Sequence, residues 1–195
     1  MTSKRKRHTF VVYVEDKPGV LNRVASLFRR RAFNIDSLTV GHSETASESR
    51  MTIVVESDAG DARRIEANLY KLVNVVRVHD ITHAPSIFRE LAMVKVATTI
   101  ETRTQIMQLV DVFRARVVDV APDSLVIETT GTEEKIEGLL EVLQPYGILE
   151  LVRTGRVGML RGKQGIAVEP SDRVEDEDPS LDDTDTEDPN VSYSV

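Results

Sequence analysis

Apolar residues change their spacing regularly along the chain up to about Val157, and this spacing predicts the secondary structure. Short runs of β-branched and aromatic residues predict strands, whereas apolar residues three and four positions apart predict helices. The resulting order is strand, helix, strand, strand, helix, strand, and the same order then repeats once. The expected strands cover residues 10–15, 34–40, 50–56, 75–81, 91–97, 117–120, 124–129 and 148–154. The expected helices cover residues 18–31, 61–73, 102–115 and 132–143.

The first expected helix, residues 18–31, has the clearest amphipathic pattern. Its apolar face carries Val20, Leu21, Val24, Ala25, Leu27 and Phe28, and polar residues occupy the other face. Pro18 suits the first helical turn, because proline presets φ and lacks an N–H that would be unpaired there. The second helix is expected to bury Ile65, Leu69, Leu72 and Val73.

Two such units predict an α+β fold. Each β-α-β-β-α-β unit is expected to be ferredoxin-like, with an antiparallel four-stranded sheet and two helices on one face. A unit of about 75 residues has a thin core, and one face of its sheet starts without cover. Pairing of units, within or between chains, would cover that face. We therefore expect a homodimer.

Charge is distributed unevenly along the chain, which has a net charge of −7. Of its 32 acidic residues, 11 lie from Glu169 onward beside one basic residue, Arg173, so this segment carries −10 and the remainder +3. Such an acidic composition predicts disorder. We expect a basic flexible terminus at 1–7, a first domain at 8–84, a linker at 85–90, a second domain at 91–162 and an acidic disordered tail at 163–195.

Composition disfavours several function classes. The chain has no Cys, which excludes disulfides, thiolate metal sites and Cys nucleophiles. No stretch approaches the roughly 18 apolar residues of a membrane span, and no aromatic residues interleave with the basic run at 4–7, so neither a membrane nor nucleic acid is an expected partner. His79 and His83 have i, i+4 spacing but fall on an expected strand and its exit, so no metal site is expected. No catalytic constellation stands out, and a cytoplasmic location is the default expectation.

The segment 16–19, Asp-Lys-Pro-Gly, is the most informative candidate site. A helix start leaves N–H groups unpaired and carries a partial positive charge, and both attract a carboxylate. Gly19 lacks a Cβ that would keep a ligand from the backbone, so the N–H groups of Val20 and Leu21 are candidate ligands. Such a pocket suits the carboxylate and ammonium of a free amino acid better than bond-breaking chemistry. The second unit has Ile-Glu-Thr-Arg at 100–103 instead, without this turn.

Asn34, Ile35 and Gly41 extend the candidate site onto the next strand. The amide of Asn34 can bind both ends of an amino acid, and Asp16 can meet its ammonium group. A larger side chain at Gly41 would crowd the pocket. Structural roles are an alternative: Pro-Gly starts a helix, Asp16 caps that helix, and Asn34 or Gly41 turns the chain. The spacing alone does not separate the two interpretations.

Six segments, which include most of the candidate-site residues, resemble the family of regulatory small subunits of acetolactate synthase (acetohydroxyacid synthase). The members of this family are ACT-domain proteins. The resemblance extends over about residues 8–162, in the same order and spacing. Its segments are residues 16–21, 33–40, 49–53, 69–75, 89–96 and 155–159.

The resemblance implies an N-terminal ACT domain that pairs across a dimer and binds valine at the interface, and a C-terminal domain of similar topology. It also implies a large catalytic partner that uses thiamine diphosphate, Mg²⁺ and FAD in branched-chain amino-acid synthesis, so that this chain would carry no cofactor of its own. The chain would be non-catalytic, activate that partner and confer feedback inhibition by valine. The family positions associated with the effector match Asp16, Gly19, Asn34 and Gly41, and Asp16 falls where many relatives have Asn.

A transcription regulator that responds to amino acids through an ACT domain is the alternative from another class. Such a protein needs a DNA-reading element such as a helix-turn-helix, and none is evident in the sequence.

Overall fold

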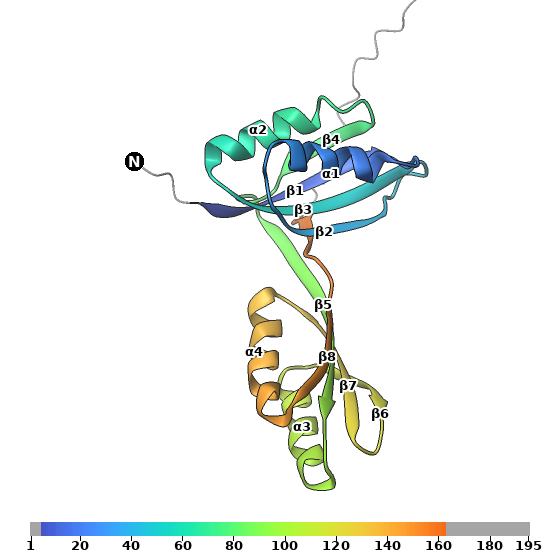
Figure 1. Ribbon diagram of the computed structural model, residues 1–195, viewed down its shortest axis with the longest axis vertical. Helices are drawn as coiled ribbons and strands as arrows, with labels where there is room; N and C mark the ends of the chain where they lie inside the picture. Colours follow the sequence, from blue (N-terminus) through green and yellow to red (C-terminus); the bar gives the residue numbers. More distant parts are fainter. Residues whose placement is uncertain (1–4, 163–195) are drawn as a thin grey trace, which may run out of the picture.

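The computed structural model describes residues 5–162, which form two α+β domains connected by long strands (Figure 1). The N-terminal domain consists of β1 (Lys6–Glu15), α1 (Val20–Arg30), β2 (Ile35–His42), β3 (Glu48–Ser57), α2 (Ala59–Leu69) and β4 (Val75–Asp80). The C-terminal domain consists of β5 (Ser86–Ala97), α3 (Ile100–Val112), β6 (Arg116–Val120), β7 (Ser124–Gly131), α4 (Glu133–Leu143), a short 3₁₀ helix (Gln144–Tyr146) and β8 (Ile148–Arg153). A last strand, β9 (Val157–Leu160), returns to the N-terminal domain.

Both domains have the expected antiparallel topology. The strand order is β2-β3-β1-β4 in the first sheet and β6-β7-β5-β8 in the second, and β9 pairs with β5 outside this order. The two helices of each domain lie on one face of its sheet (Figure 1). The prediction of an α+β fold with two ferredoxin-like units is therefore confirmed.

Helix α1 contributes the central apolar layer of the N-terminal core. Val20, Val24, Leu27 and Phe28 are buried against the sheet, at the i, i+4, i+7, i+8 spacing of one helical face. The prediction that Leu21 joins this face was wrong, because its side chain is 44% exposed. Leu21 lies about 100° around the helix from Val20, at the margin of the buried stripe.

The start of α1 also differs from the prediction that placed Pro18 in the first helical turn. Gly19 precedes the helix with φ +84°, in the left-handed region that favours glycine, and the helix begins at Val20. Pro18 therefore lies before the cap residue and does not set a helical φ. The glycine is required here by the turn that joins β1 to α1.

Helix α2 ends earlier than predicted, at Leu69. Leu72 lies in the following turn and is partly buried against the core, whereas Val73 is 91% exposed. The prediction that Val73 is buried was wrong, because the chain leaves the helix before it reaches this residue. At its other end, Asp58 caps α2 by accepting hydrogen bonds from the N–H groups of Gly60 and Asp61, both at 2.8 Å.

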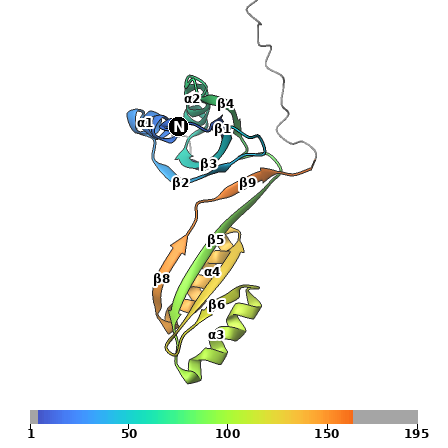
Figure 2. The same ribbon diagram turned by 90° about the vertical axis from the view of Figure 1, so that its right-hand side faces the viewer.

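The segment 85–90, predicted as a linker, is regular structure: from Ser86 onward it forms the first half of β5. Residues 86–89 pair with β9, a strand that the pattern of apolar residues does not predict. This β5–β9 ribbon covers part of the helix-free face of the first sheet (Figure 2), where Phe88 and Leu160 pack on Val11, Tyr13 and Ile81. The chain itself thus covers some of the sheet face that was expected to be bare.

Two predicted terminal segments fall largely beyond the structure. Residues 1–4 and 163–195 lie outside the described residues. Lys6 and Arg7, which were predicted to belong to a flexible terminus, are the first residues of β1.

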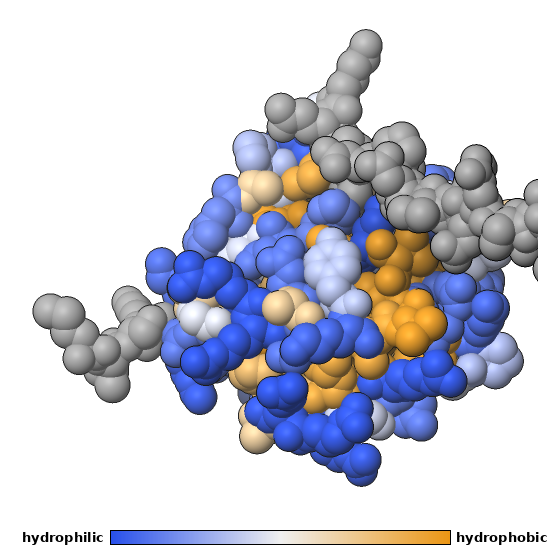
Figure 3. Space-filling view, turned by 90° about the horizontal axis from the view of Figure 1, so that it is seen from above, coloured by the Kyte–Doolittle hydropathy of each residue, from blue (hydrophilic) through white to orange (hydrophobic). Residues whose placement is uncertain are grey.

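Seen from above, over the N-terminal domain, hydrophilic side chains cover most of the surface, and hydrophobic ones gather on one side (Figure 3).

Candidate functional site

The start of α1 offers unpaired backbone N–H groups. Within residues 5–162, no side chain caps this helix and its first turn contains no acidic residue. The N–H of Val20 has one long contact, 3.4 Å to the carbonyl oxygen of Lys17, and no described carbonyl accepts from the N–H of Leu21. The free groups and the helix dipole favour an anion at this point.

The other three α-helices within the described residues are different. The side chain of Asp58 caps α2, and the side chains of Thr99 and Thr102 form a reciprocal capping box at α3. Helix α4 carries Glu133 and Glu134 in its first turn. Among the four α-helices within residues 5–162, α1 alone starts with neither a side-chain cap nor an acidic first turn.

Asp16 lies at the end of β1 beside this helix start. Its Oδ1 accepts a hydrogen bond from Ser49 Oγ at 3.2 Å, and its Oδ2 is 3.4 Å from His42 Nδ1. The alternative in which Asp16 caps the helix is wrong, because α1 has no side-chain cap. Nearly half of the Asp16 side chain is exposed, at 47%, so its carboxylate remains accessible to a ligand.

Gly41 lies at the same end of the sheet as Asp16. It pairs with Arg50 of β3, which in turn pairs with Tyr13 near the end of β1. A Cβ at Gly41 would meet no atom within 4 Å, so one chain alone leaves space around it. The structure therefore brings Asp16, Gly19, Val20, Leu21 and Gly41 to one end of the domain.

Asn34 and Ile35 lie at the opposite end, so the expectation that Asn34 sits beside the Pro-Gly turn of its own chain was wrong. Strands β1 and β2 are both antiparallel to β3 and thus parallel to each other, so β2 begins near the start of β1. Gly41 lies six positions after Ile35 along the strand, which corresponds to roughly 20 Å. Ile35 packs against the core, whereas Asn34 is exposed and its Nδ2 lies 3.5 Å from Asp36 Oδ1.

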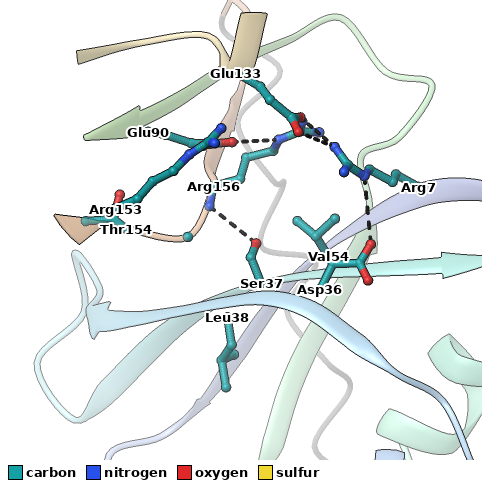
Figure 4. A pocket seen from close by; sticks show the side chains of 11 residues that line it. Arg7, Asp36, Ser37, Leu38, Val54, Glu90, Glu133, Arg153, Thr154 and Arg156 are labelled. Atoms are coloured by element: carbon teal, nitrogen blue, oxygen red, sulfur yellow. Dashed lines mark hydrogen bonds and ion pairs between the residues drawn. The ribbon is translucent and has the colours of Figure 1, made fainter. Parts of the chain in front are cut away.

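A second polar cluster joins the two domains near the start of β2 (Figure 4). Arg7 of β1 bonds Glu133 of α4 at 2.5 Å, and its Nε lies 3.8 Å from Asp36. Glu133 also accepts from Arg156 at 2.7 Å. Charged side chains of both domains line a cavity of about 380 Å³ here.

These contacts lower the pKa of Glu133. The hydrogen bond from Arg7 is the main cause, and the charges of Arg7, Arg156 and Arg153 act in the same direction against the opposing effect of burial. A carboxylate whose pKa is lower in the folded state stabilises the fold fully above its unfolded pKa of about 4.3. That contribution is lost as the pH falls through the lower, folded-state pKa.

We therefore expect the contact between the domains to weaken on acidification below about pH 4. Small-angle X-ray scattering should show a radius of gyration that is constant from neutral pH and increases in this acidic range. Glu133→Gln, which cannot ionise, should reduce the pH dependence. An identical acid profile in wild type and variant would contradict this role of Glu133.

Comparison with known proteins separates the two domains in the same way. Residues 10–77 match the model of the "AHAS small subunit-like ACT domain", and residues 89–162 match that of the "Small subunit of acetolactate synthase". The acetolactate synthase small subunit of Mycolicibacterium smegmatis is 51% identical over 166 residues, covering 85% of this chain and 98% of the relative. The chain belongs to the family of acetolactate synthase small subunits.

Further relatives of this acetolactate synthase small subunit agree with the assignment. A probable acetolactate synthase small subunit of Archaeoglobus fulgidus is 49% identical over 158 residues, covering 81% of this chain and 99% of that relative. The crystal structure of the small subunit from Thermotoga maritima has a TM-score of 0.76 at 41% identity, covering 80% of this chain and 98% of that one. None of the small subunit's helices within residues 5–162 has the length and apolar content to cross a membrane.

Sequence patterns alone did not identify five charged residues that line the cavity between the domains: Arg7, Glu90, Glu133, Arg153 and Arg156. Arg7 was assigned to a solvated basic terminus, although it lies in β1 and bonds Glu133 across 126 residues of sequence. A partial signal was present, since Arg156 follows Gly155 inside one of the segments that resemble the family. No local sequence pattern indicates that these five residues contact one another.

Proposed function

We propose that this acetolactate synthase small subunit binds and activates the large catalytic subunit, and that valine reverses this activation when it binds the ACT domain. The location would be cytoplasmic and the pathway that of valine, leucine and isoleucine. Family membership supports the assignment to a two-subunit enzyme. The observation that carries the effector proposal is the uncapped start of α1 beside an accessible carboxylate.

The two charged ends of an amino acid fit this arrangement. The unpaired N–H groups at the start of α1, including that of Leu21, would bind the carboxylate of valine. Asp16 would bind the ammonium group through a charge-assisted hydrogen bond. Gly19 keeps the backbone approachable, since a Cβ built there meets no atom within 4 Å and φ is +84°.

A second copy of the chain would complete the site. Strand β2 is one edge of its sheet, and an edge strand readily pairs with another chain. A twofold axis across this edge would make the two β2 strands antiparallel, so that the start of one lies beside the end of the other. Asn34 of one copy would then reach the site formed by Asp16 and Gly19 of the other. Pairing through β4, the opposite edge of the sheet, would leave Asn34 of one copy far from Asp16 and Gly19 of the other.

Valine would control the partner through a difference in affinity. A ligand shifts an equilibrium only if it binds one conformation better than another, and coupling of about 1–3 kcal/mol is typical. Because the site would lie between two copies, valine should also stabilise the dimer by linkage. Isoleucine and leucine should act more weakly, since an apolar pocket discriminates one methylene by about 1–3 kcal/mol.

The chemistry would belong to the catalytic partner, together with thiamine diphosphate, Mg²⁺ and FAD. Residues 5–162 contain no group of three or more His, Asp or Glu side chains placed to hold a metal ion. The residues of this chain would bind the effector and the partner subunit. No step of the condensation of pyruvate is assigned to them.

Co-purification tests the proposal directly. A tagged form of the full chain, isolated from its native host, should bring down the catalytic subunit, and the complex should form acetolactate faster than the catalytic subunit alone. Valine should remove this increase. Failure to recover or stimulate the catalytic subunit would contradict the proposal, and specific binding to host DNA would favour the transcription regulator.

A further inference from the structure

A continuous series of polar contacts leads from the proposed effector residue Asn34 to the C-terminal domain. Asn34 Nδ2 lies 3.5 Å from Asp36 Oδ1, and Asp36 Oδ2 lies 3.8 Å from Arg7 Nε. Arg7 Nη1 then lies 2.5 Å from Glu133 Oε1, at the first residue of α4 (Figure 4). The contact with Glu133 is much the closer of the two that Arg7 makes. Two carboxylates, one from each domain, therefore share one guanidinium group.

Beyond Glu133 the contacts continue through the C-terminal domain. Arg156 Nη2 lies 2.7 Å from Glu133, and Arg156 Nε lies 3.7 Å from Glu90. Arg153 Nη2 bonds Glu90 at 2.7 Å. The side chain of Glu90 is only 9% exposed, and those of Glu133 and Arg156 are about one-fifth exposed. Removing one partner of such shielded pairs leaves a poorly solvated charge, so these contacts hold Arg156 and Glu133 in place more firmly than surface pairs would.

The backbone of the same segment is attached to β2. The N–H of Arg156 donates to Ser37 Oγ at 3.3 Å, and Thr39 Oγ1 donates to the carbonyl oxygen of Arg156 at 3.4 Å. Gly155 allows this close approach, because a Cβ there would lie 2.7 Å from Thr39 Oγ1 and 3.3 Å from the backbone N of Leu38. A displacement of β2 would therefore act on Arg156, which also binds Glu133.

Asp36 lies at an irregularity in the pairing of β2. The pairing of β2 with β3 shifts between Ile35 and Ser37, which leaves Asp36 without a partner in the register. Such a bulge re-aims a side chain and interrupts the ladder. The side chain of Asp36 can thus change its contact with Arg7 without unpairing the rest of β2.

We propose that competition between Asp36 and Glu133 for Arg7 relays the state of the effector site to the C-terminal domain. This inference rests on the proposed function, in which Asn34 binds valine. When valine engages the amide of Asn34, Asp36 loses its contact with that amide and attracts Arg7 more strongly. Arg7 then moves away from Glu133, and the contact between the domains weakens. The two states are Arg7 held by Glu133 without effector and Arg7 held by Asp36 with it.

Reciprocity gives this relay a specific signature. If valine must weaken the Arg7–Glu133 contact in order to bind, then removing that contact beforehand must strengthen valine binding by the same coupling. Glu133→Gln should therefore bind valine about 5–10-fold more tightly than wild type, at the lower end of the usual range of such coupling. A variant that merely damaged the fold would bind valine more weakly.

The experiment uses the full chain and L-valine. Calorimetry gives the dissociation constant, and hydrogen exchange reports the backbone of α4 with and without saturating valine. In wild type, valine should increase exchange in the first turns of α4. Glu133→Gln should bind valine more tightly than wild type. Its α4 should exchange faster than that of wild type without valine, and valine should not change this exchange. Arg7→Gln should behave in the same way, which keeps the test decisive if one variant folds poorly.

Glu128→Gln is the matched control. Glu128 pairs with Arg116 at 2.5 Å, as Glu133 does with Arg7, but both partners lie within the C-terminal domain. This variant should bind valine with wild-type affinity, and its α4 should show the hydrogen exchange of wild type. The relay would be overturned, and the proposed function would stand, if Glu133→Gln bound valine with unchanged or weaker affinity. The same holds if valine did not change the hydrogen exchange of α4 in wild type. Absence of valine binding to wild type would overturn the proposed function and the relay with it.

Discussion

Replacing Asn34 by alanine is expected to weaken valine binding by about ten-fold or more. Asn34 is exposed at the start of β2, where its amide would bind a charged group of the ligand. Hydrogen bonds to charged groups contribute about 1.5–3 kcal/mol, and each 1.4 kcal/mol corresponds to about ten-fold in affinity. Calorimetry of valine binding to the full chain measures the loss. Gln108→Ala, which removes an exposed amide from α3, should leave the affinity unchanged.

Mixed dimers test whether Asn34 acts from the neighbouring copy. Co-expression of Asn34→Ala and Gly19→Ala chains under different tags gives dimers with one change in each copy. If each site combines Asn34 of one copy with Gly19 of the other, one site of the mixed dimer is intact and the other carries both changes. The mixed dimer is then expected to have half as many tight valine sites as the wild-type dimer. Two equally impaired sites would instead place both residues in one chain and contradict the proposed dimer.

Leu27→Ala is expected to destabilise the N-terminal domain by about 2–5 kcal/mol, the usual cost of removing a buried leucine side chain. Leu27 is 6% exposed and packs in the core between α1 and the sheet. The lost atoms leave a cavity, because the neighbouring side chains relax only in part. Urea denaturation followed by circular dichroism, at a protein concentration held constant, gives the change in the free energy of unfolding.

Leu21→Ala provides the comparison in the same helix. Leu21 is 44% exposed, so the same chemical change should cost much less, within about 1 kcal/mol. If Leu21 contributes to the proposed dimer, this variant should instead lower the dimer affinity, which sedimentation at several concentrations would reveal. Equal destabilisation by the two substitutions would contradict the orientation of α1.

The spacing of apolar residues predicted the order of the elements well, because each helix and strand must turn its apolar side toward a core. The same spacing was less informative at the ends of elements. Val73 continues the pattern of α2 but lies after the helix has ended, and it is 91% exposed. Leu21 lies at the margin of the apolar stripe of α1, where periodicity cannot decide between core and surface. Packing against the sheet fixes the rotation of the helix.

The predicted arrangement of the candidate-site residues agrees only in part with the structure. Asp16, Gly19 and Gly41 do lie at one end of the domain, next to the uncapped start of α1. Asn34 follows α1 closely in the sequence, yet it lies at the other end of the sheet. The connection from β1 through α1 to β2 joins parallel strands, so the chain has returned to its starting end before β2 begins. Strand pairing decided this placement.

The α+β class and the two repeated units could be predicted from the amino-acid sequence, because they depend on residues near one another in the chain. The strand β9 and the contacts of Arg7 and Arg156 with Glu133, across 126 and 23 residues, became evident from the packed structure. A charged residue has the same local pattern whether it is solvated or paired, and its partner is set by how distant strands and helices pack. The interface between the domains was therefore decided by the fold.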